Sequence, residues 1–192
     1  PYQREGKRGR REETQRIGGI IMTLTTISII AATAIYLAYN AICLALFSIP
    51  ESLSNTYYLY KEKCNKGWLF CLMMYAVVAL MMPAWISLSV GSSFQFLSFF
   101  APAAILFVGT APAFLSNPLE NMVHQVAAYA SAVFSLLWII LVTPYWWIIL
   151  LCLLVIAALA IVTNTYKNSY IYWLEIAAFT STFITTILFS IL

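Results

Sequence analysis

The sequence contains very little charge. Only 9% of its 192 residues are Asp, Glu, Lys or Arg, and aspartate is absent altogether. A soluble domain carries about 25% charged residues, whereas apolar residues make up 62% of this chain. A chain with so few charges cannot cover a water-facing surface. The composition therefore excludes a soluble globular domain and predicts a membrane protein.

Residues that bind metals or perform catalysis are equally scarce. The chain has one histidine, His124, and four cysteines without Cys-x-x-C spacing. One histidine cannot supply both axial ligands of a bis-histidine haem or a His-rich zinc or di-iron site. The sequence also lacks the Gly-Lys-Ser/Thr, Gly-x-Ser-x-Gly and His-Glu-x-x-His motifs. We therefore assign no metal, no cofactor and no catalytic residue from the sequence.

The positive charge is concentrated near the N-terminus. Six of the ten Lys and Arg residues lie within residues 1–16, and three more lie in the segment 50–66. Such a tail is typical of a topology signal or a contact with anionic lipids, and it comes without a soluble module that could bind nucleic acid. We expect residues 1–16 to be a basic cytoplasmic tail, the protein to lie in the cell (inner) membrane, and no nucleic acid to be a partner.

Six apolar segments follow this tail. A helix needs about 20 apolar residues to cross a bilayer, and six stretches reach or approach that length. They cover residues 17–49, 67–90, 94–115, 118–142, 145–163 and 170–192. They lack the polar/apolar alternation of barrel strands, and Trp and Tyr mark several of their ends. The sequence predicts an all-α, polytopic membrane protein in which residues 17–192 form one bundle of six transmembrane helices.

The segment 50–66 is the only long connection between these stretches. The hydroxyls of Ser52, Ser54 and Thr56 can bond to the backbone, and Tyr57 and Tyr58 can lie at the membrane interface. One interpretation is a lid or ligand-contacting loop at the mouth of the bundle. The other is a helix-capping turn followed by an amphipathic interfacial segment. Tyr57 and Tyr58 are candidate ligand contacts under the first interpretation.

Glu120 and His124 are four residues apart, so they share one helix face that continues through Ser131. Histidine titrates near neutrality, and the two side chains could form a proton-handling pair. A structural alternative is equally concrete. With Asn117 as the N-cap and Pro118 as the first helical residue, Glu120 reaches the position at which Glu closes a capping box.

Glu175 lies inside the last apolar segment, about one turn below an aromatic belt. A carboxyl at membrane depth is costly and normally has a partner or a wet cavity. No Lys or Arg is expected within a span, so the partner would be His124, a tyrosine or water. We expect a small polar cavity between the segments 118–142 and 170–192, with Glu120, His124, Glu175 and Ser131 as its polar groups.

Residues 107–114 read Phe-Val-Gly-Thr-Ala-Pro-Ala-Phe, and Val123, His124 and a helix of small residues follow them. This stretch resembles a pattern in the DUF998 and Frag1/DRAM-type families of bacterial six-helix membrane proteins, where a Gly/Pro-rich helix end precedes a helix carrying one histidine. The resemblance covers about thirty of the 192 residues. It implies a helical bundle in a bacterial membrane and no particular reaction.

These observations favour a non-enzymatic membrane protein that binds or transports a small solute or lipid through the expected cavity. Two alternatives remain open. The first is an intramembrane lipid-modifying enzyme that uses the same His and Glu side chains. The second is a structural subunit whose small-residue helix faces dock another membrane protein.

Overall fold

The computed structural model describes residues 2–192, and for residues 2–12, 14, 15 and 17 it describes the backbone alone. Over this range the chain forms seven α-helices. Their bounds are α1 (Tyr2–Phe47), α2 (Thr56–Cys64), α3 (Trp68–Leu88), α4 (Leu97–Thr110), α5 (Pro118–Val142), α6 (Trp147–Val162) and α7 (Tyr170–Ile191). The prediction of an all-α protein is confirmed.

Four of these helices are long and apolar enough to cross a membrane. They are the part of α1 from Gly18 to Phe47, α3, α5 and α7. The apolar helices α4 and α6 have 14 and 16 residues, which corresponds to about 21 Å and 24 Å at 1.5 Å per residue. A bilayer core is about 30 Å thick. The protein is thus a helical membrane protein. Of the six predicted spans, four are long and apolar enough to cross a membrane.

The observed helix bounds differ from several of the predicted segments. The first helix begins at Tyr2, so the backbone of the predicted tail continues into α1 without a break, whereas Pro1 and most of the tail's side chains lie outside the described residues. The predicted span 94–115 is shortened to α4, since Pro112 lacks an N–H and disfavours the helical conformation at Ala111. The segment 50–66 contains a helix of its own, α2.

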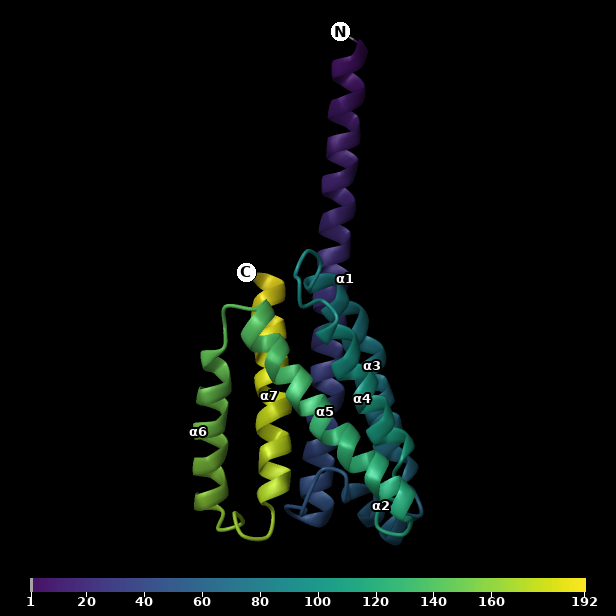
Figure 1. Cartoon of the computed structure of the whole chain (residues 1–192), viewed down its shortest axis with the longest axis vertical. Coiled ribbons are helices and arrows are strands. Elements are labelled where there is room, and N and C mark those ends of the chain that lie inside the picture. Colours follow the sequence, from purple (N-terminus) through teal and green to yellow (C-terminus); the bar gives the residue numbers. More distant parts are fainter. Residues whose placement is uncertain (1) are drawn as a thin grey trace.

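Apart from the short α2, consecutive helices run alternately up and down, and α5 is tilted relative to the others (Figure 1). The N-terminal part of α1 extends beyond the bundle, at the same end as the C-terminus. The helix α6 packs along α7 at one edge. The helix α5 crosses the face of the bundle diagonally, so it meets α7 near their C-terminal ends and diverges from it toward their N-terminal ends. This divergence determines where the candidate site lies.

Two stacked tryptophans join α3, α5 and α7 at the end where α5 meets α7. The rings of Trp85 and Trp138 are 4.8 Å apart with an interplanar angle of 10°. The indole N–H of Trp85 donates to Thr186 Oγ1 at 2.9 Å, and that of Trp138 donates to Ser89 Oγ at 2.7 Å. A buried indole needs a partner for its N–H, so these bonds also specify how the three helices dock.

Candidate functional site

A short stretch between α1 and α2 enters the bundle. In this inserted segment, residues 51–56, the side chains of Leu53, Ser54 and Thr56 are at most 3% exposed. Residues 51–55 are not helical, and inside the bundle such a backbone must find partners in the surrounding protein. The carbonyl of Glu51 accepts a hydrogen bond from the N–H of Tyr172 at 3.1 Å, which ties the segment to α7.

Glu175 on α7 is a second anchor of the inserted segment. Its Oε2 accepts a hydrogen bond from the backbone N–H of Leu53 at 2.6 Å, and a bond to a carboxylate is stronger than one between neutral groups. Within residues 2–192, Oε1 of Glu175 has no hydrogen-bond partner. The partner of this carboxyl is therefore a backbone amide, and one of its oxygens remains available as an acceptor.

His124 on α5 is the third anchor. Its Nε2 lies 2.9 Å from Ser54 Oγ, and its Nδ1 lies 3.0 Å from the carbonyl oxygen of Ala111. A carbonyl oxygen can only accept, so Nδ1 carries the proton and Nε2 accepts from the Ser54 hydroxyl. The ring of Phe114 stacks on the imidazole at 4.3 Å. The buried histidine is thus held in one tautomer and one orientation.

Glu120 bonds to the turn before α5 rather than to His124. Its Oε2 accepts from the N–H of Ala113 at 3.0 Å. Asn117 is the N-cap of α5, as predicted, and its Oδ1 accepts from the N–H of Leu119 at 3.0 Å. The N–H of Asn117 itself donates to the Ala113 carbonyl. The carboxyl of Glu120 therefore stabilises the α4–α5 turn.

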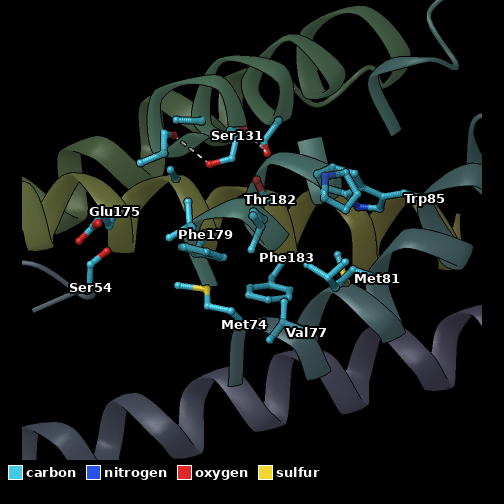
Figure 2. A pocket seen from close by; sticks show the side chains of 18 residues that line it. Ser54, Met74, Val77, Met81, Trp85, Ser131, Glu175, Phe179, Thr182 and Phe183 are labelled. Carbon is cyan, nitrogen blue, oxygen red and sulfur yellow. Dashed lines mark hydrogen bonds between the residues drawn. The ribbon is translucent and has the colours of Figure 1, made fainter. Parts of the chain in front are cut away.

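A cavity of about 90 Å³ lies among α3, α4, α5 and α7. Figure 2 shows Ser54 and Glu175 at one end and Trp85 at the other. Between these ends the walls are mainly apolar, with Met74 and Val77 on one side. The segments 118–142 and 170–192, now α5 and α7, supply only part of this lining together with α3 and α4, and the lining is mainly apolar, whereas the sequence led us to expect a polar cavity.

The cavity is closed on one side and accessible on another. Its lining residues on α3, such as Met74, Val77 and Trp85, are buried. Those on α5 and α7 include the partly exposed Ala132 and Ala178 beside the buried Ser135 and Thr182. The cavity therefore opens sideways between α5 and α7, where these two helices diverge (Figure 1).

The predicted site residues separate into three groups. Ser131 and Glu175 line the cavity, and His124 contacts it through Ser54. Glu120, Tyr57 and Tyr58 do not line it. The hydroxyl of Tyr58 accepts from the N–H of Leu115 at 2.8 Å, so this residue braces the α4–α5 turn.

Sequence reasoning missed Ser54 as the partner of His124. Both residues were singled out, but they lie 70 positions apart, and no local spacing rule connects them. The only signal for Ser54 was its place in a hydroxyl-rich loop. Likewise, Leu53 carries no polar side chain, so nothing in the sequence marks its backbone amide as the partner of Glu175.

The fold and the site define an α-helical membrane protein with a mainly apolar, laterally open cavity that ends at a carboxyl group. Comparison of the chain with known protein families, with curated proteins and with solved structures finds no match.

Proposed function

We propose that this protein binds a small lipid-soluble molecule in the cavity between α5 and α7. One observation carries the proposal: a mainly apolar cavity opens sideways and ends at an acceptor oxygen, Oε1 of Glu175, that has no partner within residues 2–192. Apolar walls favour a hydrocarbon body, and a few polar groups orient it. The ligand class that fits is an amphiphile with an alkyl body and a hydroxyl or ammonium head that donates to Glu175.

The size of the cavity limits how much of the ligand it encloses. At about 90 Å³ it is smaller than the engineered 150 Å³ cavity that holds benzene. A short part of an alkyl chain fits inside, and the rest of the molecule would extend through the opening between α5 and α7. Passage of a solute along the bundle has less support, because Trp85, whose ring stacks on Trp138, occupies the end opposite Glu175.

The proposal includes six membrane crossings and a cytoplasmic basic tail. The alternating direction of α1, α3, α4, α5, α6 and α7 supports this number, as does the position of both chain ends at one end of the bundle (Figure 1). Residues 111–115 after α4 and 144–146 before α6 are mainly apolar and add to the length of these two helices. The Lys and Arg residues near the N-terminus favour the cytoplasmic side for that end.

Cysteine labelling with an impermeant maleimide tests the topology. In a background with the other cysteines replaced, Cys64 and Asn168→Cys should react from one side of the membrane and Ser93→Cys from the other. All three positions are exposed. Labelling of all three from the same side would contradict the six-crossing arrangement.

Photolabelling in liposomes tests ligand binding. A long-chain alcohol carrying a diazirine should crosslink to peptides of α5 and α7. Ala132→Trp fills the cavity and should lower the labelling about tenfold or more, because the ligand loses the space that it occupies. The matched control is Val133→Trp, because Val133 is the neighbouring residue and is 52% exposed. Equal loss in both variants, or uniform labelling of all exposed helix faces, would rule out the cavity as the binding site.

A further inference from the structure

Ser54 and His124 have the geometry of a nucleophile and its general base. The hydroxyl donates to Nε2 of the imidazole at 2.9 Å, and the Ala111 carbonyl orients the ring through Nδ1–H at 3.0 Å. This is the arrangement by which a base activates a serine: the base lies within hydrogen-bond reach of the hydroxyl, and a third group orients the base. We propose that Ser54 is a catalytic nucleophile that takes an acyl group from an ester of an amphiphilic lipid.

The position of Ser54 gives such an ester access to the hydroxyl. Ser54 lines the polar end of the cavity, beside Glu175, and the walls between it and Trp85 are mainly apolar (Figure 2). An alkyl chain that enters between α5 and α7 would place its ester group at this polar end. The inference therefore rests on the proposed function, because the substrate uses the same cavity.

A donor for the developing oxyanion lies on the nucleophile itself. The backbone N–H of Leu53 donates to Glu175, and that of Asn55 donates to Ser52 Oγ at 3.0 Å. For the N–H of Ser54, in contrast, residues 2–192 provide no hydrogen-bond acceptor. Such unpaired groups are uncommon in a buried segment. The N–H of the nucleophile is also one of the two oxyanion donors in chymotrypsin-type serine proteases.

The chemistry is two successive acyl transfers. Ser54 Oγ bonds to the ester carbonyl carbon while its proton moves to Nε2 of His124. The bond from that carbon to the alcohol oxygen then breaks, and the departing alcohol takes the proton from His124, which leaves an acyl ester on Ser54. Water then attacks the acyl carbon and gives a proton to Nε2. The bond to Oγ breaks, Ser54 recovers the proton, and the products are one carboxylic acid and one alcohol.

An alkyl fluorophosphonate tests the nucleophile, because it reacts covalently with activated serines. The full chain in detergent micelles or nanodiscs should form one adduct, which peptide mass spectrometry should locate on Ser54. Ser54→Ala should lose it, and His124→Gln should slow the labelling by about 100-fold or more, the usual contribution of a general base. The control is Ser116→Ala, an exposed serine on the α4–α5 turn, which should label normally.

The pH profile separates catalysis from a structural tether. In the unmodified protein the labelling rate should follow the ionisation of His124, so His124→Gln should remove this dependence, whereas Glu175→Gln, which removes the other titratable group beside Ser54, should keep it. A Ser54–His124 bond that only holds the inserted segment would produce no such profile. The Ser54→Ala variant could unfold. Two other measurements therefore decide whether Ser54 is an activated nucleophile: the position of the adduct in the unmodified protein, and the labelling rate of folded His124→Gln.

The outcomes distinguish this inference from the proposed function. If the unmodified protein forms no adduct at Ser54, or if His124→Gln labels at the unmodified rate, the nucleophile is excluded, whereas photolabelling by the unreactive alcohol still reports binding. If Ser54 is labelled equally in Ala132→Trp and in the unmodified protein, the cavity is not the route to it. In that case the nucleophile stands but its substrate does not arrive through the cavity, and photolabelling by the alcohol decides the binding proposal separately.

Discussion

The backbone N–H of Leu53 donates to Oε2 of Glu175 across 2.6 Å, although 122 positions separate the two residues. This bond joins the segment after the first helix to the last helix. Together with the bond between Ser54 and His124, it places a polar, non-helical segment at the end of a mainly apolar cavity. Each of these contacts can be tested by substitution.

Glu175→Leu should destabilise the protein. The substitution leaves the N–H of Leu53 without an acceptor, and an unpaired buried donor costs about 1–3 kcal/mol. Glu175→Gln should cost less, because an amide oxygen can still accept that bond. Reversible unfolding in mixed micelles measures the difference. The control is Leu174→Ala at a position that is 57% exposed on the same helix, and equal stability of all three variants would contradict the anchoring role.

His124→Ala should loosen the inserted segment without disrupting the helices. It removes the partner of Ser54 Oγ and the stacking surface of Phe114. Loss of about 1.4 kcal/mol of local stability raises amide exchange about tenfold. Hydrogen-exchange mass spectrometry should show this increase in peptides that cover residues 51–56. Peptides from the middle of α3 are the internal reference, and an unchanged exchange rate in the segment would show that His124 does not restrain it.

Ser89→Ala should weaken the junction of α3, α5 and α7. The indole N–H of Trp138 would lose its acceptor in a site where Trp138 is fully buried. We expect a cost of about 1–3 kcal/mol in the free energy of unfolding. Ser93→Ala is the control, because Ser93 is exposed in the turn that follows α3. A Ser89 variant as stable as the Ser93 variant would mean that this hydrogen bond contributes little.

Gly67→Ala should disturb the contact between α2 and α3. A Cβ at this position would lie 2.9 Å from both the carbonyl oxygen and the Cε2 atom of Tyr57. The backbone oxygen cannot move without shifting α2, so we expect a loss of about 1–3 kcal/mol. At Gly18 nothing lies within 4 Å of an added Cβ, so Gly18→Ala should be neutral or stabilise the helix by up to about 1 kcal/mol. Thermal unfolding compares the two, and the reverse order would refute the steric argument.

Some helix boundaries could be predicted because their signals are local. Asn117 caps the helix that Pro118 begins, since the amide oxygen reaches backbone N–H groups only two and three residues ahead. The helix α4 is shorter than the predicted segment 94–115, because Phe94 and Phe96 before it and the residues 111–115 after it are apolar but not helical. In an apolar turn hydropathy does not mark where the helix stops.

The candidate site was predictable only in part. The depth of Glu175 in an apolar segment indicated that it needs a partner, and the partner proved to be a backbone amide that no residue type reveals. The possible pairing of Glu120 with His124, one of two alternatives, followed from their spacing on one helix face. In the structure each side chain instead forms hydrogen bonds with residues outside α5. Glu120 bonds to Ala113, and His124 bonds to Ala111 and Ser54.

The sequence by itself determined that the protein lies in a membrane and that it is helical. A low charge content and long apolar runs favour burial in lipid, and in lipid the backbone must form its hydrogen bonds within helices. Only the tertiary structure decided which polar groups meet and where space remains between the helices. Those features depend on contacts between residues that are distant in the chain, such as Ser54 with His124 and Leu53 with Glu175, and on the angle at which α5 crosses α7 (Figure 1).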